Sequence, residues 1–193
     1  KMGVEDREAL ALLVLSAVLD GYDGARLERA LVQGEGQANG RVADSAGSSA
    51  SIMGRGPSLF MLTGVPAKGK TVADVEAALR AQIKKVADEG VQEDELKRVK
   101  IQWMASNVYE RDSVMGQAQN LGSYWIQGMP LDAEDKLLAE LQKVTSDEVK
   151  AVAAKYFGDD QLTVGTLNPQ PLPAGGKPQR PMSGKADMGG SVH

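Results

Sequence analysis

The chain has 193 residues, of which 42% are hydrophobic and 25% are charged, with a formal net charge of −4. No block of lysine or arginine stands out, so nucleic acid is not an expected partner. No apolar run approaches the roughly 20 residues that span a bilayer, and we expect no membrane segment. The chain has one histidine, His193, and no cysteine. A zinc site usually takes three or four ligands from His, Cys, Asp and Glu, so we expect no zinc site in this chain.

The first predicted element is a helix over residues 6–20, which is apolar on almost every side. Such a helix is typical of a central position, covered on several faces. A short helix is predicted over residues 25–32, followed by a Gly-rich turn over residues 33–40. Small residues and then apolar ones predict two neighbouring antiparallel strands, over residues 40–53 and 58–65.

Helices dominate the rest of the chain. They are predicted over residues 71–90, from residue 93 onward, and over residues 113–124, 132–144 and 145–157. Thr71 with Asp74 and Thr145 with Glu148 have the spacing of capping boxes at two of the starts. A last strand is predicted over residues 161–167. The remaining residues, 168–193, are rich in Pro and Gly and are expected to form a disordered tail.

Adjacent strands that do not alternate with helices predict an α+β fold, in which an antiparallel sheet packs against helices. We expect one domain over residues 1–167, followed by the tail over residues 168–193. A Gly-rich loop, residues 34–40, resembles a phosphate-binding loop. It follows a helix and precedes a strand, whereas phosphate binding needs the reverse order, so we interpret it as a turn.

Several side chains that could carry a function are better explained by structural roles. The acidic run over residues 93–95 is interpreted as helix capping. Trp103, Tyr109, Tyr124 and Trp125 are expected to pack in the core, and Tyr22 and Arg26 to be hinge and surface residues. The serines of residues 45–51 lack a histidine partner for nucleophilic catalysis. The small side chains of that strand would let a packed helix, or else an extended peptide, approach its backbone closely.

The order of these segments resembles a known family. Residues 6–10, 19–21 and 25–31 (DREAL, LDG and ARLERAL), then residues 90–96 (GVQEDEL) and 128–132 (GMPLD), resemble the second, non-zinc domain of pitrilysin/insulinase-type zinc peptidases. That group includes mitochondrial processing peptidase and paired bacterial subunits. The resemblance covers residues 4–169. It implies a metallopeptidase-like half-domain whose opening strand, ahead of the first helix, is missing from this chain.

The resemblance also implies where the chemistry lies. The family's zinc-binding HxxEH belongs to the first domain, so zinc would be held by an N-terminal domain of the parent protein and by nothing in this chain. Many second domains offer the substrate an Arg and a Tyr seven residues apart. The matching, substrate-facing positions here are Val32 and Asn39, so the pair is degenerate. A second domain without the pair resembles the back half of the zinc-bearing subunit.

The expected function is therefore that of a non-catalytic C-terminal domain of a zinc metalloendopeptidase, inactive alone, forming chamber wall and subunit interface for peptide substrates. The alternative is a structural or assembly subunit of the same fold without peptidase activity. Implied partners are its own N-terminal domain, a homologous partner subunit and a peptide. The family implies a bacterial periplasmic or cytoplasmic location. Because an unpaired sheet edge invites pairing with another chain, we also expect the isolated chain to self-associate.

Overall fold

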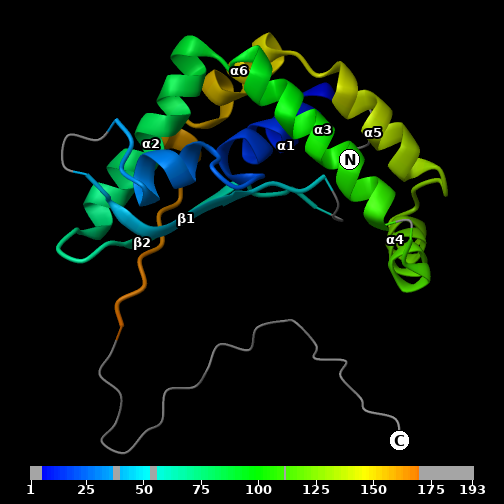
Figure 1. Ribbon diagram of the computed structural model, residues 1–193, viewed down its shortest axis with the longest axis horizontal. Coiled ribbons are helices and arrows are strands. Elements are labelled where there is room, and N and C mark those ends of the chain that lie inside the picture. Colours follow the sequence, from blue (N-terminus) through cyan, green and yellow to red (C-terminus); the bar gives the residue numbers. More distant parts are fainter. Residues whose placement is uncertain (1–5, 37–39, 53–55, 111, 170–193) are drawn as a thin grey trace, which may run out of the picture. The chain divides into compact units, whose positions relative to one another are not determined.

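The computed structural model describes residues 6–36, 40–52, 56–110 and 112–169 (Figure 1). The chain divides into two compact units, residues 1–163 and residues 164–193, and the helices and strands of the described residues belong to the first. In chain order the elements are α1 (Arg7–Asp20), η1 (Glu28–Val32), β1 (Ala43–Ser49), β2 (Met61–Pro66), α2 (Val72–Glu89), α3 (Glu93–Glu110), α4 (Val114–Ile126), α5 (Ala133–Lys143), α6 (Ser146–Tyr156) and η2 (Asp159–Gln161).

Helix α1 lies at the centre of the first unit, as its apolar sequence predicts. It packs against β1 on one side and against α3, α5 and α6 on others (Figure 1). Asp6 caps its start by accepting a hydrogen bond from the Ala9 amide at 3.1 Å. Leu10, Val14 and Val18 are fully buried. The helix therefore forms the middle of the hydrophobic core rather than one wall of it.

The two strands form an antiparallel hairpin, with Ser45 opposite Val65 and Ser49 opposite Met61. Helix α2 packs on β2, and glycine permits this close approach: a Cβ added at Gly64 would lie 2.5 Å from Val75 Cγ1. On β1, the Ser48 hydroxyl donates to the Ser16 carbonyl of α1 at 2.9 Å. One face of the hairpin is thus covered by helices.

Both predicted capping boxes are present. Thr71 and Asp74 exchange hydrogen bonds at the start of α2, and Thr145 and Glu148 do so at the start of α6. The short helix predicted over residues 25–32 ends as a wider turn, η1, in which the Gln33 amide bonds to the carbonyl five residues back. Local sequence therefore predicts where these helices start.

The prediction of a last strand over residues 161–167 is wrong. Residues 159–161 form a short 3-10 turn, and residues 162–169 have no regular secondary structure. Leu162 does have extended backbone angles, with φ −91° and ψ 135°. A strand also needs a neighbour for its backbone groups. The sheet that the described residues form contains only β1 and β2. The expected tail lies outside the described residues apart from Asn168 and Pro169.

Helices packed against one antiparallel hairpin confirm the predicted α+β class. The described residues include no helix that is both long enough and apolar enough to cross a membrane. One packing prediction is wrong. Trp125 of α4 is 71% exposed, whereas Tyr124 is buried and Trp103 packs against the core. The side chain of Tyr109 lies outside the described residues.

Candidate functional site

The positions matched to the family's Arg/Tyr pair do not form a visible site. Val32 is the last residue of η1 and is partly exposed. Its apolar side chain can neither donate nor accept a hydrogen bond. Asn39 lies outside the described residues. The assignment of Val32 and Asn39 as substrate-facing positions therefore stays a prediction.

The outward face of the hairpin is a more substantial surface. In the ladder, the pairs Ser45↔Val65, Gly47↔Thr63 and Ser49↔Met61 alternate with the pairs that face the helices. Successive residues of a strand point to opposite faces, so these six residues share the face opposite α2. Asp20, the last residue of α1, reaches this face, since a Cβ added at Gly47 would lie 2.9 Å from Asp20 Oδ2. None of them is charged, and the three on β1 have small side chains. We call these six residues the outer sheet face.

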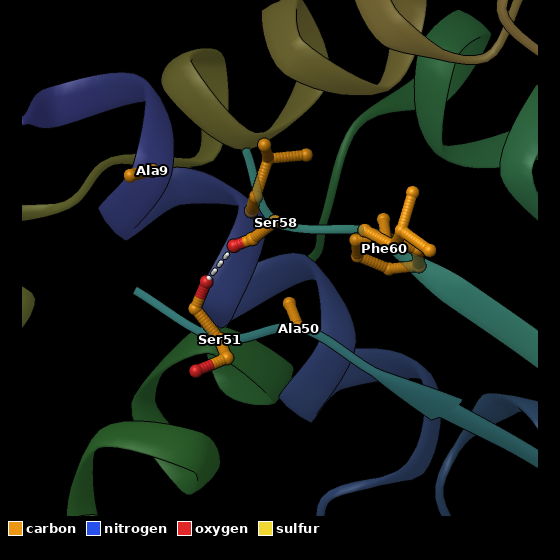
Figure 2. Close-up of a pocket in the computed structure, with 7 residues that line it drawn as sticks. Ala9, Ala50, Ser51, Ser58 and Phe60 are labelled. Carbon is orange, nitrogen blue, oxygen red and sulfur yellow. Dashed lines mark hydrogen bonds between the residues drawn. The ribbon is translucent and has the colours of Figure 1, made fainter. Parts of the chain in front are cut away.

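A shallow pocket lies where the connection between β1 and β2 meets α1 (Figure 2). The Ser58 hydroxyl donates to the Ser51 carbonyl at 2.5 Å, drawn as the dashed line. The lining is uncharged: Ala9, Leu12, Ala50, Ser51, Ser58, Leu59 and Phe60. Its volume of about 30 Å³ holds one or two water molecules. Without an ionisable group, the pocket has no acid, base or metal ligand to offer a substrate.

A buried ion pair joins the turn after α1 to the start of α3. Two nitrogens of Arg26 donate to the two carboxylate oxygens of Glu95, at 2.8 Å and 2.6 Å. Arg26 also donates to the Gly90 carbonyl at 3.3 Å, and the Gln92 amide donates to Glu95 at 3.2 Å. Both charged residues are 8% exposed. The prediction that Arg26 is a surface residue is wrong, because its charge is neutralised in the interior.

The pKa values around this pair follow from its geometry. Burial acts to raise the pKa of Glu95, but hydrogen bonds and charge from Arg26, with the Gln92 amide and Arg29, hold that pKa below its usual value. Burial and the Glu95 charge raise the pKa of Tyr22, whose ring lies 5.5 Å from the Arg98 guanidinium. A carboxylate so fully bonded is an ion-pair anchor, and it is poorly placed to act as a base.

The residues present do not fit a zinc ion. No three His, Cys, Asp or Glu side chains cluster closely enough to hold a metal in the part of the chain that the structure describes. The one histidine, His193, lies outside that part. Glu95, the most deeply buried carboxylate described, is bonded to arginine on both oxygens. We therefore derive no reaction step through zinc in this chain.

Solved structures share this fold. A protease from Helicobacter pylori matches with a TM-score of 0.73 and 20% identity, over 82% of this chain but only 37% of its own. A candidate zinc protease from Bordetella pertussis matches with a TM-score of 0.71 and 16% identity, over 87% of this chain and 89% of its own. The inactive peptidase domain of a candidate zinc protease from Bordetella parapertussis matches with a TM-score of 0.69 and 17% identity, over 89% of each chain. The fold is that of a peptidase-type domain.

A match to a protein-family model shows to which family this peptidase-type domain belongs. The model of the peptidase M16 inactive domain matches residues 3–103, which is more than half of the 193 residues. The chain belongs to this family, as an inactive peptidase M16 domain. This confirms the resemblance to the second, non-zinc domain of such peptidases. No curated protein matches the chain.

Proposed function

We propose that this chain is the non-catalytic domain of a zinc metalloendopeptidase, and that its outer sheet face forms part of the wall of a chamber for peptides. The parent enzyme's zinc would lie in an N-terminal domain outside this chain. The observation that carries the proposal is a sheet face built from six small or medium residues without charge, on a domain of the inactive family.

The chemistry of this face suits an unspecific peptide wall. Ser45 and Ser49 have small side chains that allow an extended chain to approach the ends of β1, whereas the Asp20 carboxylate lies against Gly47 in the middle of the strand. Met61 and Val65 are about half exposed and supply apolar contact for side chains. The six residues themselves are uncharged, so selection of a peptide by charge would act through the neighbouring Asp20 carboxylate.

The proposal extends to partners. A wall alone confines nothing, so the domain would act with its own N-terminal domain and with a homologous partner subunit. This arrangement assigns the chain a supporting role and places every bond-breaking group elsewhere.

Two measurements on the 193-residue chain test the proposal. In the first, fluorogenic casein is incubated with the chain and equimolar zinc chloride, and we expect no hydrolysis above the blank. Zinc-dependent cleavage that co-purifies with the chain would show that the domain is catalytic. As a control for tail-bound metal, the same assay uses a variant lacking His193.

In the second measurement, an unfolded peptide carrying a benzophenone group is photo-crosslinked to the chain, and the adducts are mapped by mass spectrometry. We expect adducts on Met61, Thr63 and Val65, and their loss in Val65→Glu together with Thr63→Glu. A matched control is Val72→Glu at the start of α2, also an exposed apolar position. Adducts found only on other surfaces would contradict the proposal that the outer sheet face contacts peptides.

A further inference from the structure

Helix α4 is amphipathic in the inverted sense. One side of the helix carries Gly116, Asn120 and Tyr124, which are buried or partly buried, as is Gln127 at its C-cap. Asn120 on this side donates to Glu134 of α5 at 3.4 Å. The apolar residues point the other way, to solvent, which is the reverse of an ordinary surface helix.

The exposed side is a regular seam. Val114, Ala118, Leu121 and Trp125 are spaced i, i+4, i+7 and i+11, and all four are exposed. Val114 is 83% exposed and Trp125 is 71% exposed. This is the spacing with which one helix packs along another. Met115 and Ile126, at 67% and 69% exposure, flank the seam. We call these six residues the α4 seam.

The segment that contains the α4 seam is itself uncharged, and the Glu134 carboxylate of α5 lies beside Asn120 on the other side of the helix. From Ser113 to Leu131 the sequence contains no Asp, Glu, Lys or Arg. Two copies of this segment can therefore approach each other without like charges meeting, whereas a charged partner would find no counter-charge here. The seam favours an uncharged helix as its occupant, and a second copy of α4 is such a helix.

The order of side-chain sizes selects one orientation. In an antiparallel pair related by a two-fold axis, Trp125 of one copy meets Val114 of the other, and Leu121 meets Ala118. Each contact joins a larger side chain to a smaller one, which is how helix interfaces interdigitate. In a parallel pair, Trp125 would meet Trp125 and Ala118 would meet Ala118, which leaves one crowded layer and one gap.

We propose that α4 is a homotypic docking helix, which pairs antiparallel with α4 of a second copy of this chain about a two-fold axis near residues 119–120. An aromatic side chain buries about 150–250 Å² at a full contact, so the α4 seam offers on the order of several hundred Å². A stable interface takes about 800 Å² from each partner. The pair is therefore a weak dimer, whose population depends on the concentration of the chain.

Sedimentation velocity of the 193-residue chain, from micromolar to near-millimolar concentration, tests the pairing. We expect the mass to double across this range, with a blue shift of Trp125 fluorescence in a Trp103→Phe background. Trp125→Glu should weaken dimerisation by at least about tenfold, because it puts a charge in place of the largest apolar side chain of the seam at both ends of the pair. Because Trp125 is exposed in the single chain, circular dichroism and the melting temperature should not change.

Val65→Glu is the matched control. It places the same charge at an exposed position on β2 and should leave the dimer intact. A chain that stays monomeric throughout overturns the proposal. So does a dimer that Val65→Glu abolishes and Trp125→Glu spares, because that dimer would form through the sheet.

The orientation has its own test, since the chain contains no cysteine. At a rise of 1.5 Å per residue, the two Val114 positions of an antiparallel pair lie about 16 Å apart along the axis, too far for a disulfide. A mixture of Val114→Cys and Trp125→Cys chains should therefore cross-link on oxidation, and Val114→Cys alone should not. Efficient cross-linking of Val114→Cys with itself would show a parallel pair and overturn the proposed register.

Discussion

Gly64 of β2 and Val75 of α2 are in closer contact than any other residue at position 64 would permit. A Cβ on Gly64 would lie 2.5 Å from Val75 Cγ1 and 3.7 Å from Leu79 Cδ1. Val75 is 3% exposed and β-branched, so it has little freedom to rotate away. The missing side chain thus sets the distance between the sheet and its covering helix.

Gly64→Ala is expected to destabilise the fold by about 1–3 kcal/mol through overpacking, although alanine is no worse than glycine in an open strand. Urea unfolding measures the loss. The loss should shrink in a Val75→Ala background, because the two changes are coupled. Gly56→Ala is the control, since a Cβ there would meet nothing within 4 Å. Equal effects of the two alanines would contradict the close contact.

Replacing either Arg26 or Glu95 alone is expected to lower the free energy of unfolding far more than replacing both together. Arg26→Met leaves a buried carboxylate without its main partner and should cost about 3–5 kcal/mol in the free energy of unfolding. Arg26→Met with Glu95→Leu removes both charges, so the double variant should regain much of that loss. Chemical denaturation of the three variants gives the comparison. If the double variant loses as much free energy of unfolding as the two single variants added together, the two residues are not coupled.

Acid should weaken the fold through the same pair. Burial acts to raise the pKa of Glu95, but the hydrogen bonds and charges of Arg26, the Gln92 amide and Arg29 together outweigh it, so this pKa is lower in the folded chain than in the unfolded one. Its stabilising contribution is therefore fully present above the ordinary carboxyl pKa of about 4.3 and is lost as pH falls toward the lower folded value. Urea midpoints measured from pH 7 to pH 3 should fall below about pH 5, and less steeply in Glu95→Gln. The pKa of Glu148, which Arg7 and Thr145 lower against the opposing effect of burial, adds to the remaining slope.

What the sequence predicts well is local. The capping boxes at Thr71 and Thr145 involve residues three apart, and the hairpin joins neighbouring segments, so spacing alone predicts them. The Arg26–Glu95 pair joins residues 69 apart. In the sequence, the one sign of this pair is that Arg26 lies between two apolar residues, Ala25 and Leu27. Both are fully buried in the structure.

Long-range packing also explains the other misses. The exposure of Trp125 depends on which side of α4 meets the rest of the chain, and an apolar seam is by itself typical of a core helix. The strand expected over residues 161–167 required a partner strand, which the residue pattern of one segment cannot supply. The outer sheet face could not be predicted from the sequence for the same reason. Which face of the hairpin is exposed depends on which face the helices pack against.

Arg7 and Glu148 are 141 residues apart and join the starts of α1 and α6, with Arg7 nitrogens 2.9 Å and 2.7 Å from the carboxylate oxygens. The same carboxylate accepts from the Thr145 amide at 2.8 Å and so completes the cap of α6. Arg7→Met should cost about 1 kcal/mol or less, because the pair is partly exposed, and Thr145→Ala about 0.5–2 kcal/mol. Because both act on Glu148, their effects in the double variant should depart from additivity by more than about 0.5 kcal/mol. Arg7→Met combined with Thr71→Ala, which removes the equivalent cap from α2, should be additive in the same urea titrations. Additivity in both pairs would show that Glu148 caps α6 without help from Arg7.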